Sequence, residues 1–361
     1  MTMQRTRRSI PATLGTLVLS AVMLAGCATN ESGDTPSSLS GTINGAGSSA
    51  QSAAQDVWVT GFQKNNAGVT VNYDPTGSGA GREQFIAGGL DFAGSDSALT
   101  ETELEGTFVG CATGSRAIDL PVYLSPLVLI FNIDGVDTLN LDAAAIAGIF
   151  SNSITRWNDP ALVALNPGSA LPDAEITAVH RSDDSGTTKN FTDYLEQNVP
   201  DVWPEAAADA FPYPGEASQG NSGVVNAVGG GLNAIGYADA SRAGDLDVAA
   251  LKVGDDFVPY SAEAAAAVID ASPLAERGNP NDLVINVDRT SSVAGVYPLV
   301  LVSYLIACEE YADPERSEVV KAYLTSIADA EGQQAAADGA GSAPLSAAYS
   351  QRVLDAIASI R

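Results

Sequence analysis

The sequence has few of the residues that catalytic and metal sites usually need. Its 361 residues include one histidine, His180, and three cysteines. A single imidazole cannot form a histidine-rich metal centre, no Cys-x-x-Cys pair occurs, and the acidic residues lack the spacing of a Ca²⁺ loop. A hydrolase triad of Ser185, His180 and Asp184 is the formal alternative, but structural packing explains His180 better, because it directly precedes Arg181 at a strand end. We therefore expect no metal, no cofactor and no catalysis.

Basic residues are also scarce. The chain has 17 Lys and Arg against 44 Asp and Glu, which gives a formal net charge of −27. No basic stripe is available to neutralise a phosphate backbone, so a nucleic-acid partner is not expected. A protein this acidic repels anions at long range. Any anion site must therefore rely on local dipoles and hydrogen bonds in a dry cleft.

The N-terminal apolar run, residues 14–24, is shorter than the roughly 20 residues of a membrane span. It follows a basic start and leads into Leu-Ala-Gly-Cys, which resembles the bacterial lipobox. We predict that residues 1–26 are a lipoprotein signal peptide and that Cys27 is the lipidated (palmitate-bearing) first residue of the mature chain. Residues 27–40 are then a flexible tether. The lipid would anchor the protein to the cell membrane on its extracellular or periplasmic face.

Two cysteines remain after Cys27, namely Cys111 and Cys308. In an exported chain, two remaining thiols suggest one disulfide. Two free buried thiols are the alternative, since the long spacing does not show that the residues meet.

Several strand-like runs end in loops of Ser, Thr, Gly or Asp, and most of these loops open a helix. They are residues 45–50, 76–81, 93–96 and 182–188. Ligands of open α/β sheets bind at the carboxyl ends of strands, and the free N–H groups of a helix start favour anions. Arg181 adds a charged fork that matches a tetrahedral oxyanion. Each loop alone could be a simple helix cap, but the recurring pattern predicts an oxyanion site.

Two apolar runs carry proline, residues 120–131 and 295–302. Proline fits poorly inside a sheet, so we expect both runs to cross between two domains. The first domain would be built from both ends of the chain, as residues 41–122 plus 299–361, and the second would be residues 123–298. The C-terminal tail shows the apolar spacing of two helices.

In this order, the loops resemble those of the phosphate-binding lipoprotein of a bacterial phosphate ABC importer, together with the motifs of residues 220–224 and 234–237. This is a class II periplasmic-type solute-binding protein, and the resemblance covers nearly all of the mature chain. It implies an α/β fold of two lobes with two hinge strands and a ligand cleft between the lobes.

The resemblance also implies a function. It indicates high-affinity extracellular binding of inorganic phosphate, delivery to the membrane permease subunits of the importer, and a monomer. The alternatives are the same fold with another oxyanion such as sulfate or molybdate, an extracellular phosphatase, and a phosphate-sensing or adhesive surface lipoprotein.

The resemblance finally assigns the residues that would contact phosphate. They are Ser49, Ala50, Ser78, Asp96, Arg181, Ser185, Gly186 and Thr187, with Asp183 holding the Arg181 guanidinium. Family members often have Thr-Phe where this chain has Ser49-Ala50, which leaves that side of the cleft smaller. Ionised Asp96 can only accept hydrogen bonds. It would therefore admit protonated phosphate and reject fully ionised sulfate.

Overall fold

The computed structural model describes residues 39–361, so the predicted signal peptide, Cys27 and most of the predicted tether lie outside the described residues. All the described residues belong to one compact unit. None of its helices combines the length and the apolar character that crossing a membrane requires.

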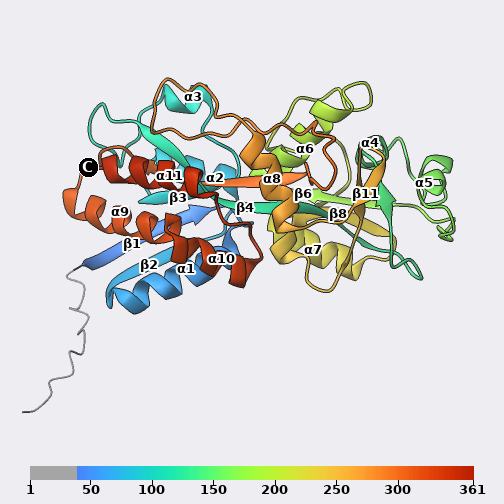
Figure 1. Ribbon diagram of the computed structural model, residues 1–361, viewed down its shortest axis with the longest axis horizontal. Helices are drawn as coiled ribbons and strands as arrows, with labels where there is room; N and C mark the ends of the chain where they lie inside the picture. The colour runs from blue at the N-terminus through green and yellow to red at the C-terminus, as the bar shows by residue number, and fades with distance from the viewer. Residues whose placement is uncertain (1–38) are drawn as a thin grey trace, which may run out of the picture. The chain divides into compact units, whose positions relative to one another are not determined.

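A mixed sheet runs through the unit (Figure 1). In spatial order its strands are β2 (Gly68–Asp74), β1 (Ser40–Gly47), β3 (Phe92–Ser95), β12 (Val300–Cys308), β4 (Ala117–Asn132), β8 (Ala234–Asp239), β6 (Thr177–Arg181) and β7 (Glu216–Ser218), with β9 (Asp247–Val248) also paired to β4. A second, small sheet has the order β11 (Asp256–Val258), β10 (Ala250–Val253) and β5 (Asn140–Leu141).

Strand β4 crosses between two groups of strands, as its two prolines predict. Its first part pairs antiparallel with β12 as far as Pro126, and its second part pairs with β8 from Leu127 onward. The second expected crossing is displaced. Strand β12 begins at Val300, after Pro298, so residues 295–302 do not form one strand. Pro298 lies outside the ladder, where its missing N–H costs no hydrogen bond.

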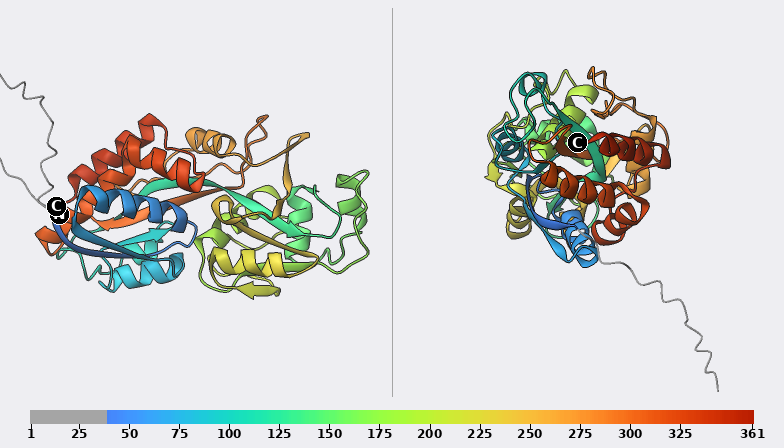
Figure 2. Two further views of the ribbon diagram at one scale, coloured as in Figure 1. Left: turned by 90° about the horizontal axis from the view of Figure 1, so that it is seen from below. Right: turned by 90° about the vertical axis from the view of Figure 1, so that its left-hand side faces the viewer.

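Most of the helices fall into two groups along the sheet, and in the left-hand view of Figure 2 the blue and red helices lie at one end and green and yellow helices at the other. We call the group around β1, β2, β3 and β12 lobe I, and the group around β6, β7 and β8 lobe II. The helices of lobe I are α1 (Ser52–Asn65), α2 (Ser78–Ile86), α3 (Glu101–Leu104), α9 (Pro314–Ala328), α10 (Ala330–Ala340) and α11 (Ala347–Ser359). Those of lobe II are α4 (Ala143–Phe150), α5 (Pro160–Leu165), α6 (Gly186–Asn198), α7 (Gly220–Gly230) and the 3-10 turn η1 (Ala240–Arg242).

The C-terminal tail holds three helices rather than the two that the apolar spacing predicts. The additional helix, α10, is rich in Ala and Gly, and its small residues pack closely against α1. A Cβ on Gly339 would come within 2.5 Å of Val57 Cγ2. Because large apolar residues are absent from α10, the periodicity of the sequence does not reveal it.

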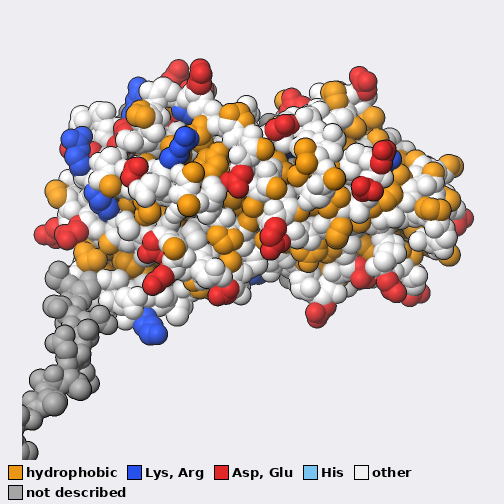
Figure 3. All heavy atoms as spheres, viewed as in Figure 1, with side chains coloured by type: hydrophobic (Ala, Val, Ile, Leu, Met, Phe, Trp, Pro, Cys, Tyr) orange, Lys and Arg blue, Asp and Glu red, His pale blue; other side chains and the backbone are white. Residues whose placement is uncertain are grey.

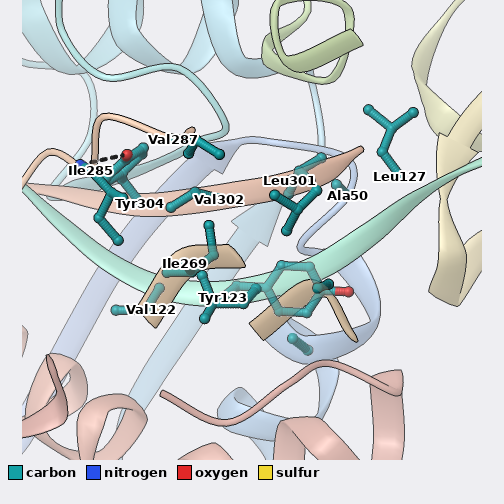
Figure 4. Packing of buried hydrophobic residues seen from close by; sticks show 14 of the residues in the cluster. Ala50, Val122, Tyr123, Leu127, Ile269, Ile285, Val287, Leu301, Val302 and Tyr304 are labelled. Atoms are coloured by element: carbon teal, nitrogen blue, oxygen red, sulfur yellow. Dashed lines mark hydrogen bonds between the residues drawn. The ribbon is translucent and has the colours of Figure 1, made fainter. Parts of the chain in front are cut away.

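The hydrophobic core continues along the paired strands β4 and β12, which run between the lobes (Figure 4). Tyr123, Leu127 and Leu301 are buried there, and Ile269 of helix α8 (Ala262–Ala271) packs over the same strands. In lobe I, Cys111 and Cys308 form a disulfide, which confirms the predicted pairing.

Candidate anion-binding site

The polar loops between β-strands and helices meet where lobe I contacts lobe II. Gly77 has φ +103°, a conformation that favours glycine, and it turns the chain from β2 into α2. In lobe II, the hydroxyl of Ser185 accepts a hydrogen bond from the Thr188 N–H at 3.1 Å, so Ser185 caps α6. The first residues of α6, Gly186 and Thr187, lie against Asp96 of lobe I.

Asp96 is the acidic group at the centre of this contact, and it is only 4% exposed. Its Oδ1 accepts hydrogen bonds from the hydroxyls of Ser48 and Ser303, both at 2.5 Å. Its Oδ2 accepts one from the Thr187 hydroxyl at 3.0 Å. Burial raises the pKa of the Asp96 carboxyl above its ordinary value, and the three hydroxyl donors oppose that rise.

Thr187 joins the acidic and basic halves of the site. Its hydroxyl accepts hydrogen bonds from Arg181 Nη1 at 3.2 Å and from Asn221 Nδ2 at 3.3 Å, while it donates to Asp96. One threonine hydroxyl thus uses its single donor on lobe I and both acceptor positions on lobe II. The residues that sequence analysis places on opposite sides of the cleft are therefore in one hydrogen-bond network.

Arg181 is buried, and Asp183 holds its guanidinium as a two-point pair. Arg181 Nε donates to Asp183 Oδ1 at 2.8 Å, and Nη2 donates to Oδ2. The Gly220 N–H also donates to Asp183 Oδ1, at 3.1 Å. Burial alone would raise the pKa of Asp183, but the hydrogen bonds and charge of Arg181 outweigh it, so this pKa lies below its ordinary value. A bidentate pair fixes the orientation of the guanidinium.

The first glycine loop places Ser49 against Asn221 of lobe II. The Ser49 hydroxyl accepts hydrogen bonds from the N–H and Nδ2 of Asn221, at 3.1 and 3.0 Å. The Ala50 amide donates to the hydroxyl of Ser48 at 3.1 Å. Ser78 contacts the backbone of Asp96, because its hydroxyl accepts the Asp96 N–H at 3.1 Å.

Gly186 allows the two lobes to approach closely. A Cβ at this position would lie 2.7 Å from Asp96 C and Cβ and from Ser97 N. Because two of these atoms belong to the backbone, a larger residue would push α6 away from β3. Gly186 is thus required by the close contact between the lobes.

Further contacts join the lobes beside this network. Arg82 Nη2 in lobe I binds Asp209 Oδ2 in lobe II at 2.8 Å, and the Ser97 hydroxyl donates to Asp209 Oδ1 at 2.5 Å. The Gly79 N–H donates to the Asp184 carbonyl at 3.0 Å. These contacts hold the two lobes in a closed arrangement.

The single histidine has a packing role. His180 Nδ1 is 2.8 Å from the Arg181 carbonyl oxygen, and its ring stacks on Phe211 at 4.3 Å between centroids. No hydrogen bond links it to Ser185 or Asp184. Among residues 39–361, no group of three or more His, Cys, Asp or Glu side chains could hold a metal ion.

Sequence reasoning missed four residues of the network. Asn190 donates through Nδ2 to the Asp96 carbonyl at 2.7 Å, and Asn221, Ser48 and Ser303 make the contacts given above. The sequence holds a feature that could have indicated two of them. Ser303 is an isolated hydroxyl in an otherwise apolar strand, and Asn221 stands at the start of a helix that follows a glycine.

Two α/β lobes connected by long crossing strands, with polar loops of both lobes in contact, define a two-lobed binding protein. The PBP superfamily domain matches residues 32–331 of this chain. Phosphate-binding protein PstS 3 of Mycobacterium leprae is 35% identical over 327 residues, which cover 86% of this chain and 88% of that protein. PstS 3 of Mycobacterium tuberculosis is 34% identical, with 97% and 98% covered. The chain therefore belongs to the PstS family of phosphate-binding proteins within the PBP superfamily.

Solved structures share the fold. The phosphate-bound, high-affinity periplasmic phosphate-binding protein PfluDING has a TM-score of 0.72 at 24% identity, with 87% of this chain and 93% of that chain covered. A phosphate-binding protein from Stenotrophomonas maltophilia has a TM-score of 0.67 at 20% identity, with 88% and 94% covered. The family and the two-lobed α/β fold predicted from the sequence are thus confirmed.

Proposed function

We propose that this protein binds inorganic phosphate between its lobes and delivers it to the membrane permease of a phosphate ABC importer. The names of its PstS relatives state phosphate binding for those proteins. The polar network described above offers both kinds of group that a protonated phosphate needs, namely donors from Arg181 and the start of α6 and an acceptor at Asp96.

The observation that carries this proposal is the contact of Asp96 with Thr187 across the lobes. Phosphate near neutral pH keeps at least one proton, so it can donate to a carboxylate while accepting from N–H and O–H groups. Asp96 Oδ1 is occupied by two serine hydroxyls, which leaves Oδ2 and its threonine partner for the ligand. Fully ionised sulfate has no proton to offer, and a buried carboxylate would repel it.

We further propose a contact set for phosphate. In lobe I it comprises the hydroxyls of Ser49 and Ser78, the Ala50 amide and Asp96. In lobe II it comprises Arg181, held by Asp183, and the helix start at Ser185, Gly186 and Thr187. A ligand that touches both lobes has its highest affinity for the closed state and so drives closure.

The remaining parts of the proposal concern the whole chain. Cys27 carries lipid and anchors the protein outside the cell membrane, residues 41–122 plus 299–361 and residues 123–298 are the two domains, and the protein acts as a monomer without catalysis. Mass spectrometry of the membrane-extracted protein tests the anchor, because a diacylated Cys27 would be the first residue.

Calorimetry of the purified protein with phosphate, arsenate and sulfate tests the ligand. We expect strong binding of phosphate and about 10⁴-fold weaker binding of sulfate, the discrimination typical of a buried polar group left unpaired. Absence of phosphate heat at micromolar protein would overturn the proposal. Preferred binding of sulfate or molybdate would replace it with the same fold serving another oxyanion.

A further inference from the structure

A cavity of about 440 Å³ opens beside Ser49, at the edge of the contact between the lobes. One wall comes from α1, with Ser52 and Asp56, and the opposite wall includes Ser222 of α7 and Arg242 of η1. Because Ser49 belongs to the proposed contact set for phosphate, this cavity leads directly to the proposed site. Arg242 is its one basic lining residue.

The charge of Arg242 is not neutralised by a carboxylate. Its Nη2 donates to the Ser222 hydroxyl at 2.6 Å, and within residues 39–361 it takes part in no ion pair. The other arginines near the lobe contact differ. Arg82 and Arg289 bind carboxylates, and Arg181 is paired with Asp183. Arg242 is therefore a basic lining residue of the cavity that has no carboxylate partner among residues 39–361.

This charge stands out because the protein as a whole is strongly acidic. With a net charge of −27, the protein repels an approaching phosphate at distances beyond a few ångströms. Figure 3 shows acidic side chains spread over both lobes on the visible face, whereas basic side chains gather mainly over the half that carries α9 and α11. A local cation at the cavity lowers the barrier that the general field imposes.

We propose that Arg242 is the residue that captures phosphate at the cavity and directs it to Ser49, so that it controls the rate of association. This inference rests on the proposed function. A charge at the rim of a binding site changes the association rate and its salt dependence, whereas a buried contact changes the dissociation rate. Arg242 is half-buried and makes one hydrogen bond, to a neutral hydroxyl, so we class it as a rim charge that acts on the association rate.

Asp56 provides an internal comparison, because its side chain is exposed on the opposite wall of the same cavity. If Arg242 acts by capture, Asp56 opposes it by repelling the ligand. If Arg242 and Asp56 instead attract each other and hold the lobes closed, loss of either charge would speed the release of phosphate. The two mechanisms thus predict different results for the variant that lacks the Asp56 charge. Capture by Arg242 predicts faster association of phosphate, whereas a closing pair predicts faster release.

The experiment measures the dissociation rate by phosphorus exchange NMR and the Kd by calorimetry, with inorganic phosphate and the purified protein; their ratio gives the association rate. At low ionic strength, Arg242→Gln is expected to lower the association rate by about 3- to 10-fold and to leave the dissociation rate within about two-fold. Asp56→Asn is expected to raise the association rate. Both changes in association rate should shrink at about 0.5 M salt, where the electrostatic screening length falls to a few ångströms.

Arg352→Gln is the matched control, because it removes the same charge from an exposed position on α11. Its association rate should equal that of the unsubstituted protein. An unchanged association rate for Arg242→Gln would overturn this inference and leave the proposed function intact. Faster release in both Arg242→Gln and Asp56→Asn would overturn it in favour of a closing pair. Absence of phosphate binding by the unsubstituted protein would overturn the proposed function, and the inference with it.

Discussion

The two lobes contribute opposite chemistry to one contact. Lobe I brings a buried carboxylate, Asp96, whose neighbours are hydroxyl groups. Lobe II brings a buried guanidinium, Arg181, and the start of helix α6. An anion has an obvious reason to bind lobe II. The acid of lobe I is unfavourable for every anion that cannot donate a proton. Lobe II therefore supplies affinity for anions in general, and lobe I supplies selectivity for a protonated one.

The lobes also differ in how each charged group is compensated. Arg181 has a carboxylate partner, Asp183, so the pair brings little net charge to the site. Within residues 39–361, Asp96 forms no ion pair with a basic group, and the hydrogen bonds to its carboxylate come from neutral hydroxyls. A buried charge without an opposite charge is costly unless hydrogen bonds satisfy it. We infer that this cost is retained because a carboxylate at this position excludes the wrong ligand.

The largest expected effect comes from removal of the selectivity group. Asp96→Asn should narrow the ratio of phosphate to sulfate affinity by up to about 10⁴, because the amide can donate to sulfate where the carboxylate repels it. Calorimetry with both anions measures the ratio. Asp209→Asn is the matched control: it removes a carboxylate from the lobe contact but lies outside the proposed contact set, so it should leave the ratio unchanged. A ratio that Asp96→Asn does not alter would remove the distinction between the lobes.

The next largest effect concerns lobe II. Arg181→Ala should weaken phosphate binding by about 2–5 kcal/mol, or roughly 30- to 4,000-fold, since it also leaves Asp183 unpaired in the contact. The selectivity for phosphate over sulfate should survive, in contrast to Asp96→Asn. Calorimetry gives the affinity, and thermal unfolding shows whether the fold persists.

A partly buried arginine beside strand β4 is the control for this variant. Arg277 binds the carboxylates of Asp119 and Asp282 away from the proposed contact set. Arg277→Ala should lower stability and retain phosphate affinity. If both variants lost affinity equally, the loss would reflect general disruption rather than a role of Arg181.

The sequence predicts the loops of the site well and their partners poorly. Ser49, Ser78 and Arg181 stand in short local patterns of strand, glycine-rich turn and helix, and such patterns need no knowledge of distant residues. The hydrogen bond from Ser303 to Asp96 joins residues 207 positions apart. It depends on the antiparallel register of β12 with β3, in which Tyr304 lies opposite Ser95. A single sequence does not determine that register.

The same limit applies to the closed contact between lobes. Gly186 is recognisable as part of a helix start, but its closeness to Asp96 follows from how the two lobes meet. The apolar runs indicate that the chain crosses between the lobes, whereas the start of β12 depends on where its ladder with β4 begins, which the prolines alone do not define.

The smallest expected effect uses a second buried acid, Asp239, at the end of β8 in lobe II. Its Oδ1 accepts hydrogen bonds from Tyr123 at 3.0 Å and from the N–H and hydroxyl of Ser241 at 2.9 and 2.5 Å. Its Oδ2, although buried, has no hydrogen-bond partner among the described residues. Asp96, in contrast, has donors on both oxygens. Burial raises the pKa of Asp239 to about 6, against the opposing effect of its hydroxyl donors.

This pKa makes stability depend on pH. Between about pH 4 and pH 6 the folded protein holds a proton on Asp239 that the unfolded chain, with a pKa of 3.8, has already released. The stability that this proton supplies is therefore complete below about pH 4 and is lost as the pH rises through 6, by up to about 3 kcal/mol. Urea unfolding across this range should show a loss of stability in the unsubstituted protein that is smaller in Asp239→Asn by the contribution of Asp239. The exposed Asp255→Asn, which makes the same charge change, should keep the slope of the parent. Parallel curves for the parent and Asp239→Asn would show that Asp239 is as well solvated as an exposed acid, and the contrast with Asp96 would then disappear.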